Sequence, residues 1–209
     1  MGASCWTLTV VYFVVQPMVA AAWEVPQYDF SFNTISDLGV TECGSYPQLD
    51  ERVVDVCSPR HALMNTTFVV VGLLTGAGAA LTRAAWPGRR VASVGLAFIL
   101  LSGVGGSLVG LAPANVNIAV HAVGALLQVP GAVGPLLLGV AAWGAERRLA
   151  VFSLVSGAVG SAACLLYFGQ IYIGLGPGGM ERLAFDPLRV WMIAVGALLL
   201  WRSIAGRRG

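Results

Sequence analysis

The stretch VASVGLAFILLSGVGGSLVGL, residues 91–111, contains no charged side chain. A helix needs about 20 mainly apolar residues to cross the hydrocarbon core of a bilayer, so this stretch predicts a membrane-spanning helix. The whole chain has the same character: 57% of its 209 residues are hydrophobic and only 11% are charged. Soluble proteins have about 25% charged residues, so the composition excludes an ordinary soluble domain.

Five further apolar runs accompany this one and predict an all-α membrane protein, a bundle of about six transmembrane helices. We expect one integral membrane domain over residues 1–209. The predicted spans are residues 5–23, 61–82, 91–111, 116–143, 149–174 and 190–204, with a polar loop over residues 24–60. The small residues of VAAAW (19–23) also fit a signal-peptide cleavage site, although no basic residue precedes the run. A retained first span and a cleaved signal peptide both stay open.

The charges are separated along the chain in a way that predicts its orientation. There is no lysine, and most arginines lie in two short connectors and the C-terminal tail: Arg83, Arg89, Arg90, Arg147, Arg148, Arg202, Arg207 and Arg208. Acidic residues gather in the remaining loops, and only Glu146 lies in an arginine-rich connector. Because basic connectors face the cytoplasm, we expect both termini there and the loop 24–60 outside the cell membrane. The same topology explains the arginine clusters, so no nucleic-acid partner is expected.

Two of the four cysteines, Cys43 and Cys57, fall in the predicted outer loop. On that side of the membrane the compartment is oxidising, so the pair predicts a disulfide. Their spacing is wider than the Cys-x-x-Cys of redox enzymes. We therefore expect a structural disulfide that stabilises the loop.

Three pairs of polar residues lie near the same predicted end of the spans. Residues four apart share one face of a helix, so each pair is expected to lie together. The pairs are Asn33–Asp37 (if that stretch is helical), His61–Asn65 and Asn117–His121. Polar side chains at membrane depth are costly and usually face the bundle interior or a water-filled cavity. The pairs therefore predict one common site.

The predicted site includes further polar residues. Gln128 continues the stripe of His121 one heptad deeper, while Glu181 and Arg182 lie in the last predicted outer loop. The predicted catalytic residues are Asp37, His61, His121 and Glu181, and the predicted substrate-binding residues are Asn33, Ser36, Asn65, Asn117, Gln128 and Arg182.

Two chemistries fit these residue types. Asp37 is expected to orient and charge-stabilise a histidine that acts as general acid or base, with Ser36 or a substrate hydroxyl nearby. The alternative is a zinc ion bound by His61, His121 and a carboxylate. No His-Glu-x-x-His motif is present, so no metal or cofactor is predicted and zinc remains the alternative. Capping of helix ends or turns is the structural alternative for the histidines and for Asp37, and Asp186 before Pro187 fits the start of a helix.

Several strings of the chain resemble the domain-of-unknown-function family 998. They are YDFSFNTISDLG (28–39), CGS (43–45), VCSPRHALMNTTFVVVG (56–72), the segments GLAP, ANVN and AVHAVGA within 110–125, and ERLAFDP (181–187). The family consists of bacterial and archaeal integral membrane proteins, distantly related to the FRAG-type and DRAM-type proteins. The resemblance covers nearly the whole chain and implies about six helices. It also implies that Asn33, Ser36, Asp37, His61, Asn65, Asn117, His121 and Glu181 occupy family-pattern positions.

These features predict a polar acid–base site at the extracytoplasmic rim of the bundle. We expect an intramembrane enzyme that acts on a lipid-like or isoprenoid-like substrate by hydrolysis, isomerisation or acid-initiated cyclisation. Its partner is then a membrane lipid or another hydrophobic small molecule. A non-catalytic lipid-binding or envelope-assembly protein is the alternative, and a small transporter is the third.

Overall fold

The computed structural model describes residues 1–48, 50–87 and 90–206, and within them six helical segments are long and apolar enough to cross a membrane. This fits a multi-pass integral membrane protein. The helices are α1 (Gly2–Leu8) with α2 (Val11–Ala20), α3 (His61–Leu81), α4 (Arg90–Leu111), α5 (Ile118–Ala142), α6 (Arg147–Phe168) and α7 (Gly176–Ala205). A short 3-10 helix, η2 (Arg83–Ala85), follows α3.

The first predicted span, residues 5–23, is two helices that meet at a bend. The hydroxyl of Thr9 donates to the carbonyl of Trp6 at 2.6 Å, and Thr9 ends α1. A threonine that bonds back to an earlier carbonyl competes with the helix ladder and bends the helix. The next four predicted spans agree with α3, α4, α5 and α6 to within a few residues, except that α6 ends at Phe168 rather than near residue 174.

The last span was predicted wrongly, because it begins at Gly176 rather than at residue 190. Pro177 lies in the first turn of α7, where a missing amide costs no hydrogen bond, while Pro187 and Asp186 lie inside the helix. Glu181 and Arg182 are consequently helical residues and do not belong to a loop. The hydropathy pattern failed here because the charged side chains of α7 face other protein groups instead of lipid.

The loop between α2 and α3 has more structure than predicted. It contains a 3-10 helix, η1 (Ser36–Gly39), and an antiparallel hairpin of β1 (Gly44–Pro47) and β2 (Val53–Val56). The predicted disulfide between Cys43 and Cys57 is present and closes the base of the hairpin. The fold is therefore a helical bundle with one small hairpin at one end.

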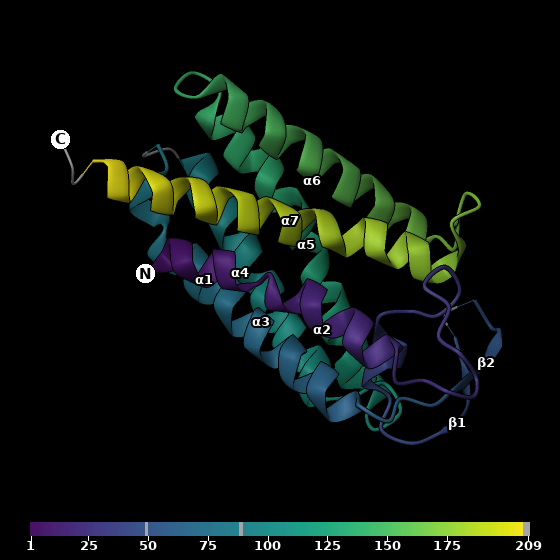
Figure 1. Ribbon diagram of the computed structural model, residues 1–209. Coiled ribbons are helices and arrows are strands. Elements are labelled where there is room, and N and C mark those ends of the chain that lie inside the picture. Colours follow the sequence, from purple (N-terminus) through teal and green to yellow (C-terminus); the bar gives the residue numbers. More distant parts are fainter. Residues whose placement is uncertain (49, 88–89, 207–209) are drawn as a thin grey trace.

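The hairpin marks one end of the bundle, and the start of α1 and the end of α7 lie at the other (Figure 1). We call these the hairpin end and the terminal end. Sequence neighbours pack side by side from α3 to α7, and α1 closes the bundle between α3 and α7. Several crossings depend on glycine: a Cβ on Gly103 would lie 2.6 Å from the carbonyl oxygen of Gly72. Such close backbone approach is typical of membrane helices.

Candidate functional site

Three polar side chains from distant parts of the chain meet at the hairpin end. Ser36 opens η1, His121 lies in the first turns of α5, and Glu181 lies near the start of α7. The Ser36 Oγ is 3.1 Å from the His121 Nε2 and 3.5 Å from the Glu181 Oε1. His121 and Glu181 are 7% and 5% exposed, whereas Ser36 is only half-buried. The serine hydroxyl is thus the most accessible of the three groups.

The hydrogen bonds of His121 define its tautomer. Its Nδ1 lies 2.9 Å from the carbonyl oxygen of Ala112, which can only accept, so Nδ1 carries the proton. In the neutral ring, Nε2 then presents its lone pair to the Ser36 hydroxyl. A base held in one tautomer by a third group, with a hydroxyl in reach, is the arrangement that activates a serine nucleophile.

The carboxylate of Glu181 lies on the other side of Ser36. Its Oε2 accepts a hydrogen bond from the amide of Ile35, which fixes the carboxylate against the start of η1. The single hydroxyl proton of Ser36 therefore faces two acceptors, the imidazole and the carboxylate. Only when a second proton resides on Glu181 or His121 do both contacts become full hydrogen bonds. A proton can consequently move between the Glu181 carboxylate and the His121 imidazole through the Ser36 hydroxyl.

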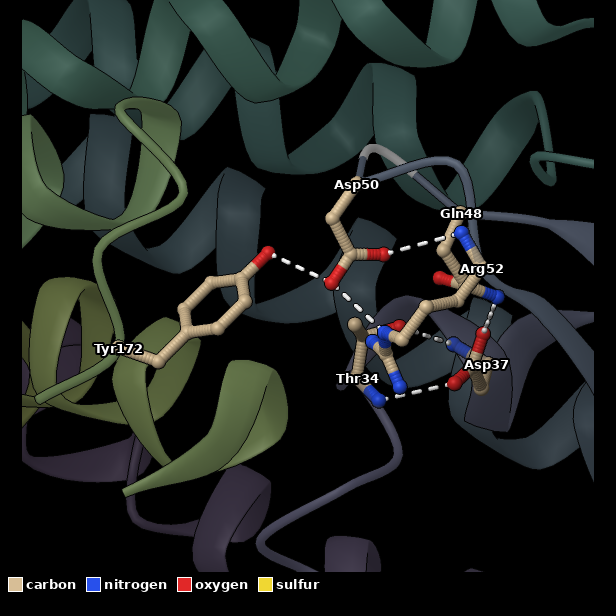
Figure 2. Close-up of polar contacts among 6 residues, drawn as sticks. All are labelled: Thr34, Asp37, Gln48, Asp50, Arg52 and Tyr172. Atoms are coloured by element: carbon tan, nitrogen blue, oxygen red, sulfur yellow. Dashed lines mark hydrogen bonds and ion pairs between the residues drawn. The ribbon is translucent and has the colours of Figure 1, made fainter. Parts of the chain in front are cut away.

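Asp37 follows Ser36 but holds the turn together instead of pairing with a histidine. Its Oδ2 accepts from the Thr34 amide at 2.8 Å, and the Asp37 amide donates to the Thr34 Oγ1 at 3.2 Å. This reciprocal pair resembles a capping box and fixes the turn that leads into η1. The other oxygen of Asp37 accepts from the Gln48 side chain at 3.2 Å (Figure 2). The expected contact between Asp37 and a histidine is absent from the part of the chain that the structure describes.

A second polar network continues from Gln48 over the hairpin. Figure 2 shows Tyr172 and Arg52 directed at the same carboxylate, Asp50, at 3.1 and 2.6 Å. Partial burial pushes the pKa of Asp50 up, but the hydrogen bonds from Arg52 and Tyr172 outweigh it and the pKa is lowered. Tyr172 belongs to the segment between α6 and α7, so this network ties that segment to the hairpin. Sequence reasoning missed it, because 122 positions separate Tyr172 from Asp50.

The residues of the two predicted histidine–asparagine pairs lie in different environments. Asn65 donates to the carbonyl of Gly39 at 2.8 Å and holds the end of η1. Asn117 caps α5 by accepting from the Val120 amide at 3.1 Å. His61, by contrast, is partly exposed at the start of α3, and its side chain forms no hydrogen bond or ion pair with another described residue. Of the two histidines, only His121 is brought to Ser36.

Arg182 binds the loop to the bundle rather than facing an open site. Its guanidinium donates to the Gln16 side chain, to the Tyr28 hydroxyl and to the carbonyls of Phe30 and Asn33. The Asn33 side chain in turn accepts from the Asp29 amide at 2.9 Å. The guanidinium of Arg182 and the side-chain oxygen of Asn33 are thus both engaged within the protein, whereas a substrate-binding role for either residue stays a prediction. Gln16, which is 5% exposed on α2, was not identified from the sequence.

Gln128 lies deeper on α5, where its side-chain oxygen accepts from Arg189 at 3.4 Å. It does not contact Ser36, His121 or Glu181 through any hydrogen bond between described residues. For metal binding, residues 1–48, 50–87 and 90–206 contain no group of three or more His, Cys, Asp or Glu side chains placed to hold an ion.

The sequence family described as "Protein of unknown function (DUF998)" matches residues 7–198, which is most of the chain. Neither the curated proteins nor the solved structures provide a match. The six apolar helices fit the membrane character expected from the resemblance. The chain therefore belongs to DUF998, a family whose function is not established.

Proposed function

We propose that the protein is an intramembrane enzyme that hydrolyses or transfers an acyl group of a lipid-like substrate, with Ser36 as nucleophile and His121 as general base. One observation carries the proposal. The Ser36 Oγ is 3.1 Å from the His121 Nε2, while the Nδ1 of the same ring is held by the carbonyl of Ala112 at 2.9 Å. This is the hydroxyl–base–orienting-group arrangement of serine hydrolases, with a main-chain carbonyl in the third role.

In the proposed reaction the Ser36 oxygen attacks the carbonyl carbon of an ester as its proton moves to the His121 Nε2. The tetrahedral intermediate collapses when the imidazolium gives that proton to the leaving alcohol oxygen, which leaves an acyl group on Ser36. Water then attacks the acyl group while His121 takes a proton from it. The second tetrahedral intermediate collapses as the imidazolium returns that proton to the departing Ser36 oxygen, which releases the acid. In the proposal Glu181, whose Oε1 lies 3.5 Å from the Ser36 Oγ, stabilises the imidazolium during the lifetime of each tetrahedral intermediate.

The surroundings of the site support a hydrophobic substrate. Ile118, one helical turn before His121, is 66% exposed, and Phe32, four residues before Ser36, is 44% exposed. Exposed apolar side chains around a polar site are suited to an amphiphile that approaches from the bilayer with its polar part toward Ser36.

The test is covalent labelling of the detergent-purified protein with a fluorophosphonate, which reports activated serines without knowledge of the substrate. In this reaction the phosphorus–fluorine bond breaks as the bond between the Ser36 oxygen and phosphorus forms. We expect peptide mass mapping to find one adduct, on Ser36. Ser36→Ala should abolish the adduct, and His121→Asn should slow labelling at least about 100-fold. Ser45→Ala, which changes an exposed serine on β1, is the matched control and should label at the wild-type rate. Absence of labelling, or labelling unaffected by His121→Asn in a folded variant, would contradict the proposal.

A second candidate reaction is proton transfer, as in isomerisation or acid-initiated cyclisation, and the position of Glu181 favours it. The carboxyl group, the Ser36 hydroxyl and the imidazole form a row along which one proton can move. Glu181→Gln separates the two candidates. It should leave fluorophosphonate labelling within about tenfold if Ser36 is a nucleophile, but it should abolish turnover if Glu181 supplies the proton.

The loop contacts favour a non-catalytic role for several other polar residues. Asp37, Asn65 and Arg182 each bond the loop to itself or to a helix. If the whole cluster is a scaffold for lipid binding or assembly, Ser36→Ala and His121→Asn should lower stability and Ser36 should not react. A transporter is less well supported, because the reactive cluster lies at one end of the bundle.

For orientation, we propose that the hairpin end faces outside the cell and the terminal end faces the cytoplasm. Arg83, Arg147 and Arg202 lie at the terminal end, as does the start of α4. The disulfide lies at the hairpin end and requires an oxidising compartment. This orientation places Ser36 on the extracytoplasmic side.

A further inference from the structure

A small cavity lies inside the bundle, deeper than the Ser36 cluster, between α3, α4, α5 and α7. Its volume is about 20 Å³, and most of its wall is apolar, with Phe68 on α3 and Phe185 and Leu188 on α7. The polar side chains on the wall are Thr75, Ser102, Gln128 and Arg189. Arg189 is thirteen residues after the first residue of α7, which is about 20 Å along the helix. The cavity therefore lies near the middle of the membrane.

The unused hydrogen-bonding capacity around this cavity consists mainly of donors. Arg189 donates to the Phe185 carbonyl at 2.9 Å and to the Gln128 oxygen at 3.4 Å, while its buried Nε–H has no partner. Since a guanidinium can only donate, Gln128 offers Arg189 its oxygen and keeps its NH₂ group for another partner. The Gln128 NH₂ and the Ser102 hydroxyl form no hydrogen bond with a described residue. Thr75 differs, because its hydroxyl already donates to Val71.

The charge of Arg189 is only partly compensated by the protein. Its guanidinium lies over the ring of Tyr12 at 4.1 Å, which provides some cation–π attraction. No carboxylate lies within 4 Å of it in the described part of the chain. The nearest acidic residue on its own helix is Asp186, one turn earlier, which attracts the guanidinium from beyond ion-pair distance and has one oxygen buried without a partner. A cation at this depth normally has a counter-charge.

We propose that this cavity binds one small monovalent anion of the chloride class, held by Arg189, Gln128 and Ser102. A volume of about 20 Å³ exceeds the 10–15 Å³ that one water molecule needs and suits a single halide ion. The lining supplies three kinds of donor around a fixed positive charge, which is the chemistry that an anion requires. The proposal is independent of the reaction at Ser36 and stands if that reaction is disproved.

The experiment measures the thermal unfolding of the detergent-purified full chain in sodium chloride, bromide or gluconate at one ionic strength. Gluconate is too large for the cavity. A ligand that binds only the folded protein raises the Tm with the logarithm of its concentration once that exceeds the dissociation constant, by about 3–6 °C at tenfold the dissociation constant. We expect this rise with chloride and bromide relative to gluconate. Equal Tm values in all three salts would overturn the proposal and would indicate that the cavity holds no anion.

Variants test whether Arg189 and Ser102 bind the anion. Arg189→Gln should remove the chloride dependence, and Ser102→Ala should weaken chloride binding several-fold. Asp186→Asn removes a repulsive charge near the site and should tighten binding several-fold. Arg202→Gln is the matched control, because Arg202 lies on the same helix but pairs with Glu146 at the terminal end; its chloride dependence should equal that of the wild type. A chloride effect that persists in Arg189→Gln would overturn the proposal, and Ser102→Ala provides the same test if that variant does not fold.

Discussion

At the scale of single residues, Asp37 is a carboxyl group that the fold buries beside hydrogen-bond donors. Its burial raises the pKa above the ordinary value of 3.8, although the hydrogen bonds from Thr34 and Gln48 act in the opposite direction. The folded protein thus binds the Asp37 proton more tightly than the unfolded chain does. Its contribution to stability is present below pH 3.8 and is lost as the pH rises through the higher pKa of the folded state.

Asp37→Asn is neutral at every pH and keeps one of the two accepted hydrogen bonds. We expect its Tm to fall less than that of the wild type between pH 3.5 and pH 7, because the burial of a charge has been removed. Asp37→Ala, which also removes the hydrogen bonds from Thr34 and Gln48, should lose about 1 kcal/mol across the whole range. The measurement is thermal unfolding of the three proteins against pH. Parallel curves for wild type and Asp37→Asn would show that Asp37 carries no such linkage.

At the scale of the elements, α1 packs against α3 at a glycine. A Cβ on Gly78 would overlap the Cδ1 of Trp6, whose ring is fully buried and meets the Trp191 ring edge to face, with 5.3 Å between the ring centroids. The Trp6 Nε1–H also donates to the Thr75 carbonyl at 3.2 Å. The ring is thus fixed on two sides and cannot withdraw from an added methyl group.

Gly78→Ala should therefore destabilise the bundle by about 1–3 kcal/mol through overpacking. Gly76→Ala, two residues away on the same helix, is the matched control, since the nearest atom to its Cβ is a carbonyl oxygen at 3.9 Å. That variant should match the wild type or gain a little from the higher helix propensity of alanine. Thermal unfolding of both variants in one detergent provides the comparison, and equal stability would show that Trp6 has room to move.

The elements also show how far the sequence could predict this fold. Apolar runs located five spans, because their lipid-facing and buried residues are equally apolar. They failed at α7, since Arg182 and Arg189 are charged yet directed into the protein, and hydropathy cannot tell a solvated charge from one bonded to other helices. The hairpin was missed because its four-residue strands are too short for a clear alternating pattern.

The candidate site was predictable only as a location. Depth arguments correctly put Ser36, His121 and Glu181 near one end of the bundle, but 85 and 145 positions separate Ser36 from the other two. No local pattern indicates which of the two predicted acidic residues, Asp37 or Glu181, lies beside Ser36 and which histidine does. Pairing across such distances depends on how the helices cross, which a single sequence does not encode locally.

At the scale of the whole molecule, the charge distribution between the two ends predicts the orientation. We expect a cysteine introduced at Val116, at the hairpin end, to react with a membrane-impermeant maleimide in intact cells. A cysteine at Gly144, which is exposed at the terminal end, should react only after permeabilisation. Both substitutions are made in a chain whose Cys5 and Cys164 have been replaced, since these are the free thiols. The opposite labelling pattern would reverse the proposed orientation.

The charged side chains of α7, which are bonded to α2, to the loop before η1 and to α5, also constrain how the protein is made. A charged residue near the centre of a spanning helix costs roughly 2.5–3.5 kcal/mol on insertion scales, and the first half of α7 carries several. The groups that satisfy them, such as Gln16, Ile35 and Gln128, are all synthesised earlier. We therefore expect α7 to enter the bilayer poorly by itself and to be drawn in by the helices already there. A nascent chain stalled before Gly176 would lack both the Glu181 carboxylate beside Ser36 and the helix against which α1 and α6 pack. Such a chain would be open to degradation by cellular proteases.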